Sequence, residues 1–143
     1  KAFLDLPRTL EFLEAAGVPV LGWQHDWFPA FYTRSSGLPV PHRVESADEA
    51  ARIFAARSRS SSGVLLTVPI PVEFELDAAN LDLVLREALD ECERAGVTGA
   101  AITPFVLGRI GEATEGRSIP ANLALAEHNA AVAAQVAVAI AAT

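Results

Sequence analysis

VPVLGWQ, residues 18–24, decides the fold, because this short and almost continuous apolar run predicts a buried strand. The run GVLLTVPIP at residues 63–71 has the same character and predicts a second buried strand. A third short strand is expected in VTGAAIT, residues 97–103. Helical segments separate these runs, and strands that alternate with helices indicate an α/β protein.

Signals for helix starts and ends lie between the predicted strands. Asp5 suits the first turn of a helix whose apolar stripe ends at Gly17. Ser46 and Glu49 form a capping box that opens a second helix over residues 47–60. The sequence therefore predicts one helix before and one after the first long loop.

That loop covers residues 25–44, which are rich in aromatic residues, proline, glycine and serine, and it is expected to end in a short strand at residues 40–44. Farther along, Asp77 caps a long amphipathic helix that ends at Gly96. Cys92 falls on the apolar stripe of this helix and is expected to be a core residue.

Two further helices complete the chain. Thr103 is the expected N-cap of a short helix over residues 105–114, and residues 115–122 lead into a final alanine-rich helix. Elements in this order predict a three-layer α/β/α fold with a mixed sheet. The sequence contains no repeat or linker, so residues 1–143 are expected to form a single domain or part of one.

Composition narrows the range of partners. Eighteen acidic and eleven basic residues give a formal net charge of −7, and no segment is rich in lysine or arginine, so a nucleic-acid partner is not expected. The apolar stretch at residues 130–143 is too short to span a membrane and contains Gln135, which predicts a tightly packed core helix and no membrane partner. A single cysteine fits a reducing cytoplasm.

The familiar motifs of phosphate-binding loops, serine hydrolases and zinc proteases are absent from the sequence. His25, His42 and His128 are far apart and adjoin no paired ligand, so we expect no metal site built from this chain alone. Asn122 and Asn129 share a helical stripe with apolar residues, which predicts that both are buried. They either satisfy neighbouring backbone groups or contact a sugar.

Lys1 is the remaining candidate. A lysine at this position is ordinarily solvated, but the apolar run AFLDL follows it directly. Burial beside that run would remove water from the ammonium group and lower its pKa, as an amine that forms a Schiff base requires.

Several motifs resemble those of the pseudouridine-5′-phosphate glycosidases, a family also called indigoidine synthase A-like. They are K-x-x-LDL-x-x-TLEFLE-x-x-GVPV, FPAFYTR-x-SG, GVLL-x-x-PIP-x-E, TPF-x-L and GRS-x-x-AN-x-AL-x-x-N-x-x-VAAQ. They occur in family order from the first residue to the last helix. The resemblance covers the whole chain and about the C-terminal half of a family member.

The resemblance implies reversible cleavage of the carbon–carbon glycosidic bond of pseudouridine 5′-phosphate to uracil and ribose 5-phosphate. It implies a manganese-dependent, cytoplasmic homotrimer with an α/β/α fold, in which Lys1 forms a Schiff base with the opened ribose. Asn122 is the implied polar residue near the sugar, and the role of Asn129 stays open. The general-acid glutamate, the manganese-binding aspartate and most phosphate contacts of the family precede Lys1, in a missing N-terminal half.

Three residues depart from the family pattern: Trp27, Val68 and His128. They keep open the hypothesis of a related Schiff-base enzyme that acts on another sugar phosphate or nucleobase. A separate alternative is a half-domain that only packs against a partner and catalyses nothing. In every case we expect the isolated chain to be inactive.

Overall fold

The computed structural model describes residues 5–57 and 63–143, and Lys1 lies outside them. Three strands form one sheet in the order β2-β1-β3: β1 is Val20–Trp23, β2 is His42–Val44 and β3 is Leu65–Thr67. Both pairings are parallel, with Leu21 opposite His42 on one side and Leu66 on the other. The α/β class is confirmed, and all strand pairings within the described residues are parallel, where a mixed sheet was expected.

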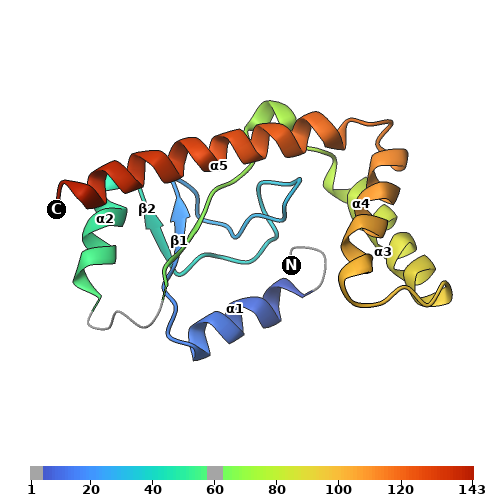
Figure 1. The fold of residues 1–143 in the computed structure, drawn as a ribbon, viewed down its shortest axis with the longest axis horizontal. Helices are drawn as coiled ribbons and strands as arrows, with labels where there is room; N and C mark the ends of the chain where they lie inside the picture. The colour runs from blue at the N-terminus through green and yellow to red at the C-terminus, as the bar shows by residue number, and fades with distance from the viewer. Residues whose placement is uncertain (1–4, 58–62) are drawn as a thin grey trace.

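Helices lie beside this sheet and beyond one of its ends (Figure 1). Helix α5, Ser118–Ala141, and helix α2, Ala47–Ala56, pack against one another on one side. Helix α1, Leu6–Ala15, lies beyond the end of the sheet at which β1 begins, and none of its residues is buried. Strand β1 itself is buried along its whole length.

The predicted N-caps of the first three helices are confirmed. The side chains of Asp5, Ser46 and Asp77 accept hydrogen bonds from backbone amides three residues later, at 3.0, 3.2 and 2.7 Å. Each bond satisfies an amide that has no partner within the first helical turn. Helix α2 ends at Ala56, whereas the sequence predicted a helix as far as residue 60.

The other two long helices form a hairpin. Helix α3, Ala78–Arg94, packs on helix α4, Ile102–Ala113, and a short 3₁₀ turn, Gly99–Ala101, joins them. The prediction of a strand at residues 97–103 is therefore wrong. Glycine and alanine favour strands poorly, and the sheet offers no neighbouring strand there.

Thr103 is not an N-cap either, because α4 begins one residue earlier, at Ile102. Helix α5 begins at Ser118, inside the segment 115–122 that was expected to lead into it. A second 3₁₀ turn, Val72–Phe74, lies between strand β3 and helix α3.

The buried apolar residues form two clusters, and α5 contributes to both. The sheet cluster contains Leu21, Trp23, Val44 and Val132. The hairpin cluster contains Tyr32, Ile70, Cys92, Val106, Ile110, Ala121 and Leu125, so the prediction that Cys92 is a core residue is confirmed. Helix α5 therefore holds the sheet and the hairpin together.

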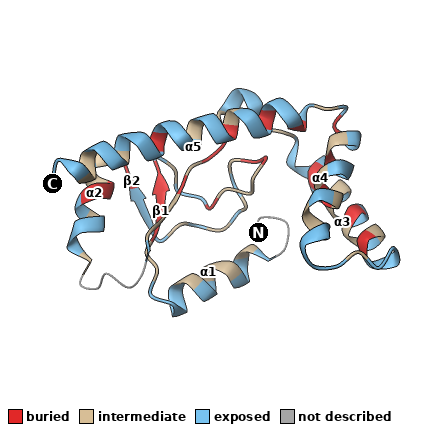
Figure 2. Ribbon diagram, in the orientation of Figure 1, coloured by how far each residue is buried: buried red, intermediate tan, exposed pale blue. Residues whose placement is uncertain are grey.

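Most of α5 is nevertheless exposed (Figure 2). The expectation of a short, tightly packed core helix is wrong: residues 130–143 fall mostly in a 24-residue helix, and only 17% of its most apolar window is buried. By length and composition this helix could cross a membrane. A single helix of this kind is weak evidence for that, because core helices of soluble proteins meet the same criterion.

The middle of β1 leaves no room for a side chain at Gly22. A Cβ atom there would lie 2.2 Å from the His25 carbonyl oxygen and 2.7 Å from Val40 Cγ2. We expect Gly22→Ala to lower the free energy of unfolding by about 3 kcal/mol, because backbone must move to admit a methyl group. Urea unfolding followed by the fluorescence of buried Trp23 measures this change.

Gly108→Ala is the matched control. Gly108 is exposed within α4, and a Cβ atom there would have no neighbour within 4 Å. This variant should gain about 1 kcal/mol from the helix preference of alanine. Equal unfolding midpoints for the two variants would contradict the packing described for Gly22.

Because the phenol of Tyr32 is buried, we expect the protein to lose stability at alkaline pH. Burial raises the pKa of its phenol above the ordinary value of 10.0, while a hydrogen bond with Ser118 lowers it by a smaller amount. Above about pH 10 the unfolded chain releases this proton first, so the folded state loses stability as pH rises toward the folded-state pKa. Tyr32 is the only tyrosine, so phenolate absorbance during alkaline titration reports this group directly.

Tyr32→Phe keeps the ring and removes the hydroxyl group. At neutral pH it should cost about 1 kcal/mol through the lost hydrogen bond. The stability of this variant should also fall less steeply than that of the parent above about pH 10. A parent phenol that titrates at its ordinary pKa would refute the burial argument.

Candidate functional site

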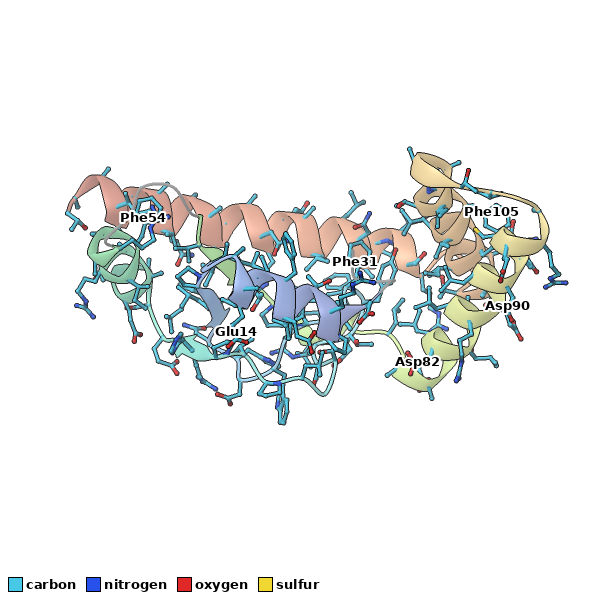
Figure 3. All side chains as sticks on the ribbon, turned by 90° about the horizontal axis from the view of Figure 1, so that it is seen from below. Glu14, Phe31, Phe54, Asp82, Asp90 and Phe105 are labelled. Atoms are coloured by element: carbon cyan, nitrogen blue, oxygen red, sulfur yellow. The ribbon has the colours of Figure 1, made fainter. Side chains whose placement is uncertain are left out.

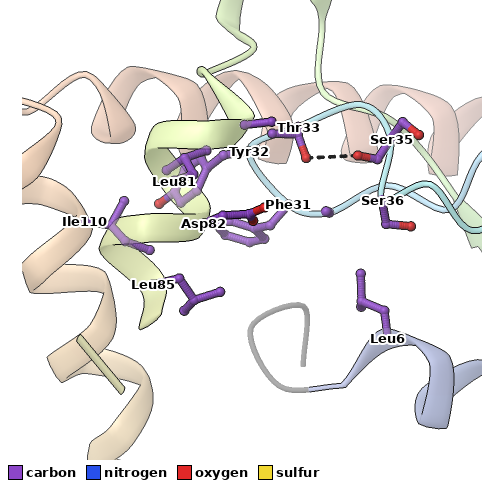
Figure 4. Close-up of a pocket in the computed structure, with 12 residues that line it drawn as sticks. Leu6, Phe31, Tyr32, Thr33, Ser35, Ser36, Leu81, Asp82, Leu85 and Ile110 are labelled. Atoms are coloured by element: carbon purple, nitrogen blue, oxygen red, sulfur yellow. Dashed lines mark hydrogen bonds between the residues drawn. The ribbon is translucent and has the colours of Figure 1, made fainter. Parts of the chain in front are cut away.

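A cavity of about 230 Å³ lies where the loop after β1 meets the α3–α4 hairpin. The loop contributes residues 30–33, 35 and 36, α3 contributes Leu81, Asp82 and Leu85, and Leu6 of α1 closes another side. In Figure 4, Tyr32, Leu81 and Ile110 lie on one side of the cavity, with Ser35 and Ser36 across from them. The lining thus combines hydroxyl-bearing side chains with apolar ones and with the carboxylate of Asp82.

Hydrogen bonds within the loop fix the position of its hydroxyl groups. Ser36 Oγ donates to the Phe28 carbonyl at 2.7 Å, and the Ser36 amide donates to the same carbonyl at 2.9 Å. Thr33 Oγ1 donates to the Ser35 carbonyl at 3.3 Å (Figure 4). Thr33 is 7% exposed, so its hydroxyl group is held inside the molecule.

Arg34 ties this loop to the segment after β3. Its guanidinium donates to the Ile70 carbonyl at 2.5 Å, and its backbone amide donates to Glu75 Oε1 at 2.7 Å. The Leu76 amide adds a third link by donating to the Tyr32 carbonyl at 3.0 Å. The loop is therefore anchored at several points to a segment about forty residues away in the sequence.

Phe31 has a backbone φ of 64°, a left-handed conformation that is rare for a bulky side chain. Its ring meets the Tyr32 ring edge-on, with centroids 4.5 Å apart. Figure 3 shows Phe31 where the strand part of the molecule meets the hairpin. Strained residues of this kind cluster at functional sites, where the surrounding structure holds them in place.

Tyr32 links the cavity to the start of α5. Its side chain is 4% exposed and hydrogen-bonds the side chain of Ser118, which is 3% exposed. Because burial raises the pKa of the phenol, Tyr32 is protonated at neutral pH and is a hydrogen-bond donor at the cavity wall.

The prediction that Asn122 and Asn129 are buried is wrong, because both are exposed. The stripe of α5 that faces the protein instead runs through Ala121, Leu125 and Val132, and with 3.6 residues per turn both asparagines lie to one side of it. Neither asparagine lines the cavity. Asn122 follows one helical turn after Ser118, and its role stays a prediction.

The three departures from the family pattern lie away from the cavity. Trp27 is 44% exposed and bridges to Pro39, and Val68 lines a separate groove beside β3. His128 Nδ1 lies 3.2 Å from the Pro69 carbonyl oxygen. None of these side chains lines the cavity, so the cavity wall is free of the departures.

Metal-binding groups do not gather in the described part of the chain. Across residues 5–57 and 63–143, no three histidine, cysteine, aspartate or glutamate side chains are placed to hold a metal ion.

Sequence reasoning did not single out Tyr32, Thr33 or Ser36 as site residues. The segment FPAFYTR-x-SG is a family motif, but on sequence alone its hydroxyl-bearing residues look like ordinary loop residues. Only the contact between residues 30–36 and α3 makes them the lining of a cavity.

Comparison with known proteins gives consistent matches. The family model described as indigoidine synthase A like protein matches residues 1–139. A pseudouridine-5′-phosphate glycosidase of Caldanaerobacter subterraneus subsp. tengcongensis is 49% identical over 140 residues, which are 96% of this chain and 46% of that protein. The protein of the same name from Sorangium cellulosum is 50% identical over 141 residues, 98% of this chain and 44% of that protein.

Two solved structures share the fold. The prealnumycin C-glycosynthase AlnA in complex with ribulose 5-phosphate superposes with a TM-score of 0.88 at 34% identity, over 99% of this chain and 47% of that one. An indigoidine synthase A-like protein from Thermotoga maritima gives 0.81 at 33% identity, over 95% and 45%. The chain thus spans about half the length of the relatives it matches. By sequence and by fold, the chain belongs to the indigoidine synthase A-like family.

Proposed function

We propose that this chain is the C-terminal half of a pseudouridine-5′-phosphate glycosidase and supplies the lysine that forms the covalent intermediate. The observation that carries the proposal is the match of nearly the whole chain to glycosidases of that name at 49% and 50% identity. The cavity supports it, because its hydroxyl-bearing residues and Asp82, set among apolar side chains, suit the hydroxyl groups of a sugar.

Lys1 is the proposed nucleophile. Its neutral amine attacks C1′ of the substrate and the bond from C1′ to the ring oxygen breaks, so the ribose opens, the ring oxygen takes up a proton, and C1′ carries both Nζ and uracil. The carbon–carbon bond to uracil then breaks as the nitrogen lone pair forms the imine with C1′, and an acid protonates the uracil carbon that receives the electron pair. Water hydrolyses the remaining imine and releases ribose 5-phosphate, which leaves the lysine free again. Leu6, which lines the cavity, places the beginning of α1 at this site.

Asn122 is the proposed sugar contact. It lies one turn after Ser118, whose side chain bonds Tyr32 at the cavity wall. Tyr32, Thr33 and Ser36 are further candidates to bind hydroxyl or phosphate oxygens, since each lines the cavity.

The remaining parts of the machinery belong to the other half of the family fold. The proposal assigns the general acid, the manganese ligand and most phosphate contacts to that half. It also includes a homotrimer and a cytoplasmic location. Manganese, when bound, supplies positive charge near the substrate.

Trapping with borohydride tests the role of Lys1. The protein for this experiment is a single polypeptide in which the complementary portion of the Caldanaerobacter relative precedes residue 1, so that Nζ is the only amine of Lys1. Ribose 5-phosphate and borohydride should reduce the imine to a stable adduct on Lys1, which peptide mass spectrometry locates. Lys1→Arg keeps the positive charge and should abolish both the adduct and uracil release.

Asn122→Ala provides the contrast within the same fusion. It should still form the adduct, but only at a concentration of ribose 5-phosphate about tenfold higher, because it removes a sugar contact and not the nucleophile. Uracil release by Lys1→Arg at the parental rate, or an adduct on another lysine, would overturn the assignment.

A second candidate function is carbon–carbon bond formation on a pentose phosphate. It is favoured by the likeness to the C-glycosynthase solved with ribulose 5-phosphate. Against it, the residues that depart from the glycosidase pattern do not line the cavity.

A substrate panel separates the two functions. With pseudouridine 5′-phosphate, the fusion should release uracil at least about a hundredfold faster than it joins ribulose 5-phosphate or ribose 5-phosphate to other aromatic acceptors, a difference of about 2.7 kcal/mol in activation free energy. Uracil release is measured by chromatography. The reverse ranking would favour the synthase.

A further inference from the structure

Asp82 gives the cavity between the loop after β1 and helix α3 its electrostatic character. It is the one acidic side chain among the described residues that line this cavity (Figure 4). Among the same residues there is no lysine, arginine or histidine. Arg34 belongs to the loop, but its guanidinium donates to the Ile70 carbonyl and does not line the cavity. The described lining therefore offers a carboxylate and no cation.

The Asp82 carboxylate is open to a ligand. Within residues 5–57 and 63–143 it accepts no hydrogen bond and forms no ion pair. Arg86, one turn along α3, donates its Nε instead to the backbone carbonyl of Asp82, at 3.1 Å. An ionised carboxylate only accepts hydrogen bonds, so this side chain suits a ligand group that donates them.

Two hydroxyl groups of the loop also serve as acceptors in this cavity. The Ser36 hydroxyl donates its hydrogen to the Phe28 carbonyl, and the Thr33 hydroxyl donates its hydrogen to the Ser35 carbonyl. A hydroxyl group has one hydrogen and two lone pairs, so these two oxygens keep acceptor capacity but no free hydrogen. Ser36 Oγ uses part of that capacity for the Leu38 amide, at 3.3 Å. Together with Asp82, they make the lining rich in acceptors.

Sugar hydroxyl groups fit this lining, and a phosphate group does not. The oxygens of a phosphate dianion accept hydrogen bonds, and their negative charge would be repelled by the Asp82 carboxylate. Sugar hydroxyl groups donate hydrogen bonds, and a carboxylate is a common acceptor for the hydroxyl groups of a ribose. The cavity therefore favours the hydroxyl-bearing carbons of a pentose phosphate over its phosphate end.

We propose that Asp82 binds the 2- and 3-hydroxyl groups of the pentose and selects ribose over 2-deoxyribose, while the phosphate group lies outside this cavity. The inference rests on the function proposed above, because it takes a pentose phosphate as the ligand. It concerns binding, so it does not depend on the covalent step that follows.

Calorimetry on the fusion with the Lys1→Arg substitution tests this proposal, because no imine forms on arginine. The ligands are ribose 5-phosphate and 2-deoxyribose 5-phosphate. With Asp82 present, the deoxy sugar should bind about tenfold more weakly, because it lacks one hydrogen bond to a charged acceptor. Asp82→Asn should weaken the binding of ribose 5-phosphate by about tenfold and reduce the preference for ribose to less than about threefold.

Asp90→Asn is the matched control. Asp90 also lies exposed on α3 (Figure 3), and its backbone carbonyl accepts from Arg94 Nε at 3.3 Å, as that of Asp82 accepts from Arg86. Asp90 does not line the cavity, and its substitution removes the same charge from the same helix. This variant should change either affinity by less than about twofold. Circular dichroism checks that both variants fold as the parent does.

The direction of the effect separates the two ends of the ligand. Tighter binding of ribose 5-phosphate by Asp82→Asn would place the phosphate group beside this carboxylate and would overturn the proposal. So would an effect equal to that of Asp90→Asn, or an unchanged preference for ribose over 2-deoxyribose. A Lys1→Arg fusion that binds neither sugar phosphate would instead overturn the proposed function, and this inference with it.

Discussion

The close approach at Gly22 is the constraint on which the rest of the structure depends. The His25 carbonyl oxygen would lie 2.2 Å from a Cβ atom there, so the chain can turn over the central strand only because that strand carries a glycine. This turn starts the loop that returns as β2 beside β1 and shapes the cavity wall on its way. One missing side chain therefore allows both the parallel pairing and the cavity.

Helix α5 joins the two halves of the core but is itself poorly buried. It holds the sheet cluster and the hairpin cluster together through Ala121, Leu125 and Val132, and it leaves most of its other apolar side chains in contact with solvent. A helix of this composition is stable in water when another surface covers it. The groove beside β3 runs along the same helix.

Local chemistry explains which predictions hold. Caps at Asp5, Ser46 and Asp77 depend on neighbours within three residues, and the buried runs at β1 and β3 are continuous, so the sequence alone sufficed for them. The strand expected at residues 97–103 failed because it needed a partner strand. The prediction that Asn122 and Asn129 are buried failed because other residues of α5 face the protein. Apolar residues occur almost all round this helix, so its sequence does not show which face is buried.

The sequence by itself determined the α/β class, the starts of the first three helices, and the motifs that tie the chain to its family. It also pointed to Lys1, whose role remains a proposal. Only the tertiary structure brought Tyr32 to Ser118 and residues 30–36 to α3, because those contacts join segments far apart in the chain. The groove beside β3 also exists only in three dimensions, since it depends on which strand lies at the edge and which side of α5 faces it.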